Sequence, residues 1–283
     1  MSTLKVSRAA LAAMLPLAGA AAWAQGPAAA EGSDMQVFVT ERLWNARWDL
    51  KLIDATVTAA PTATSPAEVM ITLRQRSSVK LVPIHSVGLR YKDLLVSASG
   101  WSASFDMGEL TTTGRSKRRE LDLTLGYTVY PGVTAALTYK QGKVDPAVSA
   151  RATALLGLTG RQKGEGVLLG ISAVAPLAPR LSLYGTLAYG LGRYQVETTL
   201  EGSRTDARYT LGDFGAGYRF DPPDRLRAIE SITVQLGYRF QVVMLRGANL
   251  KLPASAAARI TNMNDGTLQT TTQGMVLSAG LAF

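Results

Sequence analysis

The stretch ELDLTLGYTVY, residues 120–130, changes character at every position. Its apolar face holds Leu121, Leu123, Leu125, Tyr127 and Val129. Its other face is acidic, hydroxylic or glycine, from Glu120 to Thr128. A period of two is that of a β-strand. Strands of about 9 to 11 residues with one apolar and one polar face suit a tilted membrane crossing, whereas soluble strands are typically shorter.

The same alternation recurs along the chain, as in SITVQLGYRFQVVM (231–244). We therefore expect an all-β fold, a transmembrane antiparallel up-and-down β-barrel of about ten strands. A phase slip around Gly212 and Asp213 predicts a β-bulge. The expected strands span roughly 36–58, 78–91, 94–106, 119–130, 133–145, 165–176, 181–199, 207–220, 229–246 and 268–283.

The connections between these strands are alternately short and long. Tight turns rich in Pro, Gly or Asp are expected at 92–93, 130–132, 176–180 and 221–225. Longer polar loops are expected at about 59–77, 107–118, 146–164, 200–206 and 247–266. This asymmetry is typical of outer-membrane barrels, whose turns face the periplasm and whose loops face outside.

The first residues have the composition of a secretory signal. Lys5 and Arg8 precede an apolar run, and Ala22 and Ala24 form an Ala-x-Ala cleavage pattern. Residues 1–24 are therefore predicted to be a signal peptide. Residues 25–34 then form a flexible periplasmic leader, and residues 35–283 form the barrel.

Aromatic residues mark one end of the expected barrel. Tyr91, Tyr130, Phe220 and Phe283 all fall where a strand reaches the turn side, the level that aromatic rings favour at a membrane interface. With the signal peptide, the amphipathic strands and the final MVLSAGLAF, the chain resembles the bacterial outer-membrane β-barrel proteins, a class that includes porins.

That resemblance implies a place in the bacterial outer membrane. It also implies contact with outer-membrane lipid and lipopolysaccharide. The barrel-assembly machinery would recognise the last strand through Leu277, Leu281 and Phe283.

The amino-acid composition excludes several kinds of site. The chain has a formal net charge of +9, no cysteine and one histidine. Without cysteine there is no disulfide, no lipoprotein anchor and no cysteine metal site, so neither a metal nor another cofactor is expected. Nucleic acid is a poor partner for a secreted chain with barrel patterning, despite the basic charge.

Strand phase assigns charged residues to the lumen, where bases outnumber acids. An electropositive lumen would favour small anions, as in a small porin-like barrel. Alternatively, a barrel this narrow is filled by its own ion pairs and hydrogen bonds. The lumen-facing charged residues are expected to be Arg47, Asp49, Lys51, Lys80, Arg90, Glu120, Asp122, Lys140, Arg208, Arg219 and Arg239.

A basic patch in GRSKRRE is expected on an outer loop. Its cations, Arg115, Lys117, Arg118 and Arg119, either bind the phosphates of lipopolysaccharide or form a solvated charged loop.

His85 invites comparison with outer-membrane proteases and lipid-modifying barrels, which use a histidine near the outer rim. His85 is expected to point outward within its strand and Ser86 to the opposite face, so no catalytic residues are assigned.

Three functions are compatible with this sequence. A structural or small porin-like barrel without enzymatic activity is favoured. A surface adhesin acting through the outer loops is the first alternative, and a lipid- or peptide-modifying enzyme is the second. The alternative fold is a soluble β-sandwich or lipocalin-like cup, whose apolar faces would point inward.

Overall fold

The structure is a computed structural model that describes residues 35–59, 67–106, 115–145, 161–196, 203–226, 228–246, 250–251, 260–264 and 267–283. The predicted signal peptide at 1–24 and leader at 25–34 lie outside the described residues and stay predictions. Within the described ranges, no helix is long and apolar enough to cross a membrane.

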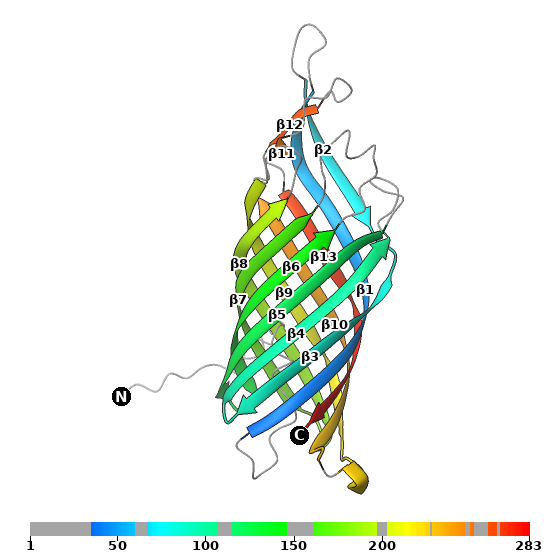
Figure 1. Cartoon of the computed structure of the whole chain (residues 1–283), viewed down its shortest axis with the longest axis vertical. Coiled ribbons are helices and arrows are strands. Elements are labelled where there is room, and N and C mark those ends of the chain that lie inside the picture. The colour runs from blue at the N-terminus through cyan, green and yellow to red at the C-terminus, as the bar shows by residue number, and fades with distance from the viewer. Residues whose placement is uncertain are drawn as a thin grey trace, which may run out of the picture.

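Ten antiparallel strands close into a barrel (Figure 1), which confirms the predicted fold class. Closure follows from β1, which pairs with β3 on one side and with β13 on the other. The barrel strands are β1 (Met35–Ala59), β3 (Lys80–Tyr91), β4 (Leu94–Asp106), β5 (Arg115–Tyr130), β6 (Val133–Asp145), β7 (Gln162–Pro176), β8 (Leu181–Val196), β9 (Ser203–Phe220), β10 (Ser231–Arg246) and β13 (Thr267–Ala282).

The seam between the first and last strands is continuous. The β1–β13 register runs from Phe38 opposite Ala282 to Ile53 opposite Thr267. Just beyond it, the backbone N–H of Val37 donates to Phe283 at 3.1 Å and that of Phe283 donates to Val37 at 2.9 Å. Phe283 thus closes the last strand against the first, with its ring 40 % exposed on the outer surface.

One end of the barrel, the turn end, is built from the predicted tight turns. Lys92 has a φ of 54° in the β3–β4 turn, and Gly132 has a φ of 78° in the β5–β6 turn. A Cβ at Gly132 would lie 2.7 Å from the backbone oxygen of Val174, so both conformation and space favour glycine there. A 3₁₀ helix, η1 (Asp224–Leu226), lies in the β9–β10 connection at this end.

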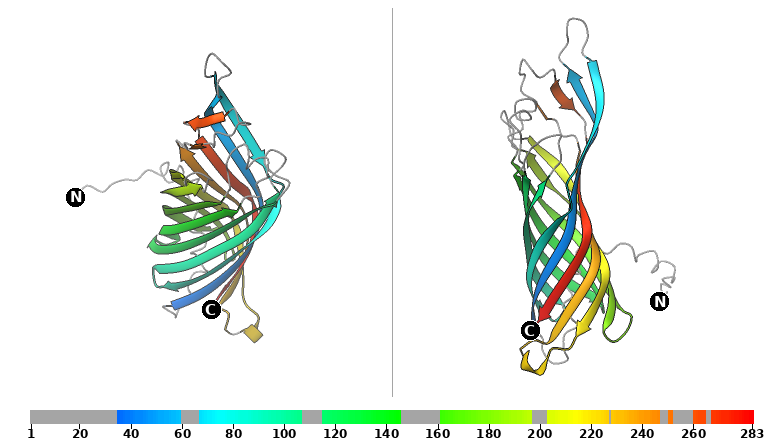
Figure 2. Two further views of the ribbon diagram at one scale, coloured as in Figure 1. Left: turned by 45° about the horizontal axis from the view of Figure 1, so that its top comes forward. Right: turned by 90° about the vertical axis from the view of Figure 1, so that its right-hand side faces the viewer.

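The opposite end, the loop end, carries a small sheet that rises above the barrel (Figure 2). The last residues of β1 pair with β2 (Ala67–Arg76) and β12 (Ile260–Asn264), and β12 pairs with β11 (Leu250–Lys251). We call β2, β11, β12 and the end of β1 the outer extension. The predicted outer loops at 59–77 and 247–266 therefore contain strands, because the first strand is long enough to template pairing beyond the rim.

The outer wall of the barrel is apolar. Leu123, Leu125, Leu169 and Leu236 are all exposed, by 46 to 71 %. A soluble cup would bury this face, so the alternative soluble fold is wrong for this chain. The arrangement matches the lipid-facing band of membrane barrels.

The interior is also partly apolar, which sequence phase did not anticipate. Trp44, Trp48, Trp101 and Phe105 form a buried cluster inside the wall of β1 and β4. Tyr209 and Leu211 belong to a second cluster. The bulge predicted near Gly212 is wrong, because β9 and β10 pair without a break from Ile232–Phe220 to Leu245–Ala207.

Candidate functional site

The charged centre of the barrel starts on β5. Strand alternation turns Arg118, Glu120 and Asp122 inward, while Arg119 and Leu121 between them face outward. Lys140 on the neighbouring β6 also points inward, opposite Asp122 in the register. Arg118, Glu120 and Lys140 are buried, with only 2 to 6 % of each residue exposed. Each charge therefore needs a partner inside the protein.

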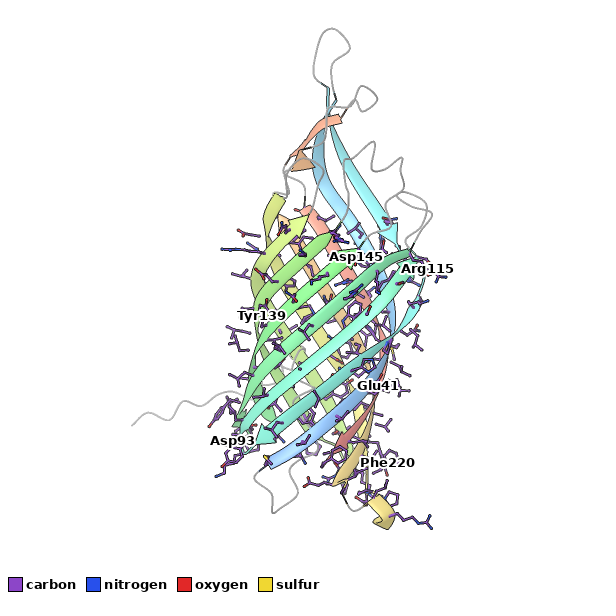
Figure 3. All side chains as sticks on the ribbon, viewed as in Figure 1. Glu41, Asp93, Arg115, Tyr139, Asp145 and Phe220 are labelled. Carbon is purple, nitrogen blue, oxygen red and sulfur yellow. The ribbon has the colours of Figure 1, made fainter. Side chains whose placement is uncertain are left out.

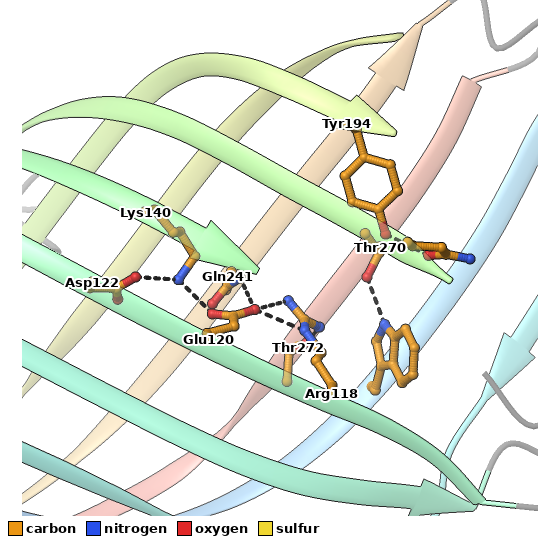
Figure 4. Close-up of polar contacts among 10 residues, drawn as sticks. Arg118, Glu120, Asp122, Lys140, Tyr194, Gln241, Thr270 and Thr272 are labelled. Atoms are coloured by element: carbon orange, nitrogen blue, oxygen red, sulfur yellow. Dashed lines mark hydrogen bonds and ion pairs between the residues drawn. The ribbon is translucent and has the colours of Figure 1, made fainter. Parts of the chain in front are cut away.

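Glu120 is the hub of this first interior network (Figure 4). Its Oε1 accepts hydrogen bonds from Arg118 Nε at 2.8 Å and from Gln241 Nε2 at 2.8 Å, and its Oε2 accepts from Lys140 Nζ. Lys140 Nζ also donates to Asp122 at 2.8 Å, and Arg118 Nη1 donates to Thr272 at 2.6 Å. Two acids and two bases are therefore joined in a single connected group.

The contact between Glu120 and Gln241 crosses the bore. Their strands, β5 and β10, lie on opposite sides of the barrel, separated by β6 to β9 one way and by β4, β3, β1 and β13 the other. The interior cavity beside them measures about 30 Å³. A water molecule needs roughly 10–15 Å³, so this cavity suits a few waters.

Asp213 is the hub of a second interior network, on β9. It is fully buried and accepts hydrogen bonds from Arg42 Nη1 at 2.6 Å, Arg239 Nη1 at 3.4 Å and the Tyr184 hydroxyl at 3.3 Å. These partners come from β1, β10 and β8, so this network also ties distant parts of the wall together.

Aromatic rings cover the guanidinium groups of both networks. The guanidinium carbon of Arg118 lies 5.5 Å from the Trp48 ring centre and 5.4 Å from that of Trp101. That of Arg239 lies 5.5 Å from the Trp44 ring centre. Such cation–π contacts are strongest where water is excluded, so the tryptophans stabilise the buried cations while filling the lumen.

The structure places most of the predicted lumen residues inside the wall. Glu120, Lys140 and Arg239 are fully buried, and Asp122 is 13 % exposed. Strand alternation also turns three partly exposed residues inward: Lys80, Arg90 and Arg219.

Four predicted lumen residues lie on the outer face instead: Arg47, Asp49, Lys51 and Arg208. Arg47 alternates with buried Ala46 and Trp48, and Arg208 with buried Ala207 and Tyr209. The prediction failed because it assumed that apolar side chains face the lipid, whereas aromatic residues of β1 and β9 fill the lumen. Asp49 is nevertheless covered, because Arg74 and Arg76 of β2 bind its carboxylate at 2.9 and 3.0 Å.

The residues of the predicted basic patch lie on both faces of the barrel wall. It belongs to β5 and not to a loop, so Arg118 points inward while Arg115, Lys117 and Arg119 are exposed outside. Figure 3 shows Arg115 and Asp145 together near the loop end. Arg115 Nε donates to Asp106 at 3.2 Å, and Arg119 lies 4.0 Å from Asp145.

Arg119 is continued sideways by two cations that the sequence analysis missed. Lys143 of β6 lies directly opposite Arg119, and Lys163 of β7 lies directly opposite Lys143. All three side chains are exposed on the outer face. We call Arg119, Lys143 and Lys163 the cation row. On each strand the residue lies just beyond the loop-side end of the outward apolar alternation, which is the signal that could have identified it.

His85 lies on the outer wall, as predicted, and has an acid partner that was not foreseen. Its Nδ1 is 2.6 Å from Glu41 Oε2, and the two residues face each other across β1 and β3. Ser86 is buried on the inner side, so it does not join the pair. Glu41 stands within the apolar run Val37, Val39 and Leu43, a position where an acid is unusual.

The part of the chain that the structure describes has no candidate metal site. No group of three or more His, Asp or Glu side chains there could hold a metal ion. The sequence analysis also missed Arg42 and Tyr184, whose inward phase becomes visible only once the register of β1 and β8 is known.

Comparison with known proteins supports the fold alone. The outer membrane protease OmpT from Escherichia coli is similar, with a TM-score of 0.53 and 13 % identity over 88 % of this chain and 96 % of that one. The translocator domain of the autotransporter NalP from Neisseria meningitidis scores 0.39 at 11 % identity, covering 89 % of this chain and 90 % of that one. The toluene transporter TodX from Pseudomonas putida scores 0.31 at 12 % identity, covering 90 % and 91 %.

No protein-family model matches the chain, and no curated protein matches it either. The fold is that of the bacterial outer-membrane β-barrels, as the sequence resemblance implied. At these identities the proteases and transporters among the similar structures do not indicate which activity this chain has.

Proposed function

We propose that this protein is a closed outer-membrane barrel that acts through the surface at its loop end, and not an open porin. The observation that supports this is the bond between Glu120 and Gln241, which joins opposite sides of the barrel within a buried ionic network. A solute passing this level would have to separate hydrogen-bonded charges in a water-poor interior, which is costly.

The outer extension gives the loop end a surface to work with. β1 continues beyond its last pairing with β13, and its final residues pair with β2 and β12 (Figure 2). Membrane barrels place short turns in the periplasm and long connections outside, which orients this extension away from the cell. The favoured role is therefore that of a surface-interaction barrel. The predicted signal peptide would direct the chain across the inner membrane to that location.

Conductance of the refolded barrel in planar bilayers tests the closed lumen. We expect a correctly folded, inserted protein that produces no ion-conducting steps. As a positive control, the combined Arg118→Ala, Lys140→Ala and Gln241→Ala variant should conduct wherever it still folds, because it removes the side chains around Glu120. Steady open channels from the unmodified chain would overturn the proposal and restore the porin-like alternative.

Cysteine labelling on intact cells tests the orientation, and the absence of native cysteine makes the result clean. An Arg74→Cys variant in the outer extension, at an exposed position of β2, should react with a membrane-impermeant maleimide. A Lys92→Cys variant at the turn end should react only after the outer membrane is opened. The reverse pattern would place the extension in the periplasm and contradict a surface role.

A further inference from the structure

The outer wall of β1 and β3 carries a polar pair in the middle of an apolar face. Glu41 and His85 lie directly opposite each other in the register, with 2.6 Å between Glu41 Oε2 and His85 Nδ1. Their side chains are 48 % and 71 % exposed, and Figure 3 labels Glu41 on this wall. The bond within the pair therefore leaves both side chains facing the surroundings of the barrel, where polar groups are costly if those surroundings are hydrocarbon.

The depth of the pair places it inside the membrane band. His85 is six residues from Tyr91 at the turn end of β3, roughly 20 Å along a tilted strand, and the apolar band of a membrane barrel is about 25 Å tall. Large apolar residues lie on both sides of the pair along its two strands, exposed by 40 to 58 %: Val39, Leu43, Leu81 and Val87.

A second feature of the same wall is a gap in the pairing of β3 with β4. Among the described residues, the β3–β4 register that starts at the turn end stops at Ile84 opposite Trp101. The remaining part of β3 continues to pair with β1, and the remaining part of β4 continues to pair with β5. Beyond the gap, the backbone N–H of Ser78 donates to Asp106 at 3.3 Å. The wall is therefore weakly held just above the pair.

Pro83 explains where this pairing stops. Val37 and Phe283 exchange backbone bonds between β1 and β13, so the odd-numbered residues of β1, including Leu43, direct their backbone groups toward β13. Pro83 lies opposite Leu43, so its backbone faces the other way, toward β4. Because proline has no N–H to donate, the ladder is interrupted at this position. Lipid cannot satisfy the backbone groups that such an interruption leaves open.

The pair is complementary to itself under a two-fold rotation. Two copies inserted the same way in one membrane are related by an axis along the membrane normal. An axis that passes between β1 and β3 brings Glu41 of each copy opposite His85 of the other. An imidazolium donates from both ring nitrogens, so Nδ1 of His85 can bond Glu41 of its own copy while Nε2 bonds that of the other. A lipid chain offers neither group a partner.

The neighbouring β4 allows a second barrel to come close. Its residues beside β3 at this level are small, since Gly100 lies opposite His85 and Ala98 lies opposite Val87. An open apolar hollow of about 640 Å³ adjoins them, lined in part by Val87, Val96 and Ala98. Outward side chains of a second copy can therefore pack against this wall without displacing large residues.

From the polar pair, the gap in pairing and the small residues of β4, we infer that the outer face of β1 and β3 around Glu41 and His85 binds the same face of a second copy. The result is a two-fold dimer within the membrane. Since β1 also ends in the outer extension, the dimer presents two outer extensions on one side of the membrane. The inference does not depend on whether the lumen conducts or on which side the extensions face.

Sedimentation equilibrium of the refolded barrel in density-matched, uncharged detergent measures the dimer directly. We expect a reversible monomer–dimer equilibrium for the unmodified protein. The double variant Glu41→Val and His85→Val keeps an apolar wall, but its dimer dissociation constant should rise about tenfold or more, because each dimer loses two bonds to charged groups. An unmodified protein that stays monomeric at every protein-to-detergent ratio would overturn the inference.

Exchanging the two residues tests the two-fold match itself. The variant Glu41→His and His85→Glu keeps the pair within each copy and still places each carboxylate opposite an imidazole of the other copy. Its dissociation constant should stay within about threefold of that of the unmodified protein. If the exchanged variant loses the dimer as fully as the double valine variant, the two-fold arrangement is wrong.

Disulfide crosslinking in the outer membrane tests the same face without detergent, and the chain has no native cysteine. Val39→Cys, next to Glu41 on the outer face of β1 and near the proposed axis, should form a linked dimer on oxidation. Leu169→Cys on β7, across the barrel and equally exposed to the outside, is the control and should stay monomeric. Equal linkage at both positions would indicate chance collisions, and a product that contains a different protein would assign the face to that protein; either result contradicts the dimer.

Discussion

Arg118 and Arg119 are neighbours in the chain, yet the barrel wall puts them in opposite environments. Arg118 is buried, bonded to Glu120 and Thr272, and lies against two tryptophan rings. Arg119 is exposed and lies opposite Lys143, another cation. The difference shows that the interior accepts a charge only with its partner supplied, whereas the outer face keeps like charges side by side.

The comparison extends to the lysines of β6. Lys140 points inward and bonds two carboxylates, Glu120 and Asp122. Lys143 is three residues further on, points outward and lies between two cations of the cation row. One strand therefore carries the same residue type in a stabilising position and in a destabilising one. The variants below use this contrast to compare buried, paired charges with exposed ones.

The largest effect is expected for Glu120→Ala. It leaves Arg118 and Lys140 buried without their shared carboxylate, which should lower the free energy of unfolding by about 3–5 kcal/mol. Urea unfolding in lipid vesicles, followed by tryptophan fluorescence, measures it, since Trp44, Trp48 and Trp101 are inside the barrel. Glu165→Ala, an exposed carboxylate on β7, is the control and should change stability little. Equal losses would contradict a structural network.

A smaller effect is expected at the pair on the apolar wall. His85→Val alone should cost about 1–2 kcal/mol, because it leaves Glu41 facing the hydrocarbon without its partner. Adding Glu41→Val should recover the loss, since the double variant restores an apolar face. The same unfolding assay applies, in vesicles rather than micelles. If the double variant is less stable to unfolding than either single variant, the pair stabilises the barrel in some way other than by partnering two polar groups in the bilayer.

Gln241→Ala should have a still smaller effect. It removes one hydrogen bond across the bore while Arg118 and Lys140 continue to hold Glu120, so the expected loss is about 1 kcal/mol. Bilayer recordings of this variant should stay silent, because the remaining charged and aromatic side chains still occupy the lumen. Conducting steps would show that this single bond closes the bore, and would narrow the barrier to one contact.

The smallest effect, and the only one of opposite sign, is expected for Lys143→Glu. It turns two like-charge pairs into opposite-charge pairs at exposed positions, where each pair contributes little, so lipid-free stability should rise by about 0.2 kcal/mol per pair. Thermal unfolding in uncharged detergent measures the gain. Lys140→Glu is the matched comparison on the same strand and should prevent folding. A Lys143→Glu variant that also loses stability would mean that the row is held by contacts within the protein.

Much of the fold could be predicted from the alternation and the turn residues. Residues 120–130 show the pattern without interruption, and β5 follows it. The turns at Lys92 and Gly132 were foreseen because they rely on local conformation. Prediction failed where the two faces of a strand were not chemically distinct. Around Tyr209 and Leu211 the inner face is more apolar than the outer face, so Arg208 was placed on the wrong side.

The candidate sites were harder to predict than the fold. Arg115, Lys117 and Arg119 were noticed as a local cluster, but Lys143 and Lys163 join Arg119 only through strand pairing. Glu41 and His85 are likewise distant in the chain and adjacent in the register. The pattern along one strand does not predict which residue of a neighbouring strand will lie beside a given position.

By itself, the sequence determined that this chain forms amphipathic strands joined by short turns and long connections, because side-chain alternation and turn dihedrals are local properties. Tertiary structure alone decided which charges meet. Glu120 bonds Gln241 because ten strands close at a radius that lets opposite walls touch, and Arg119 lies beside Lys143 because of the β5–β6 register. Closure and register depend on the whole sheet, so the contact across the bore and the cation row arise only when every strand is in place.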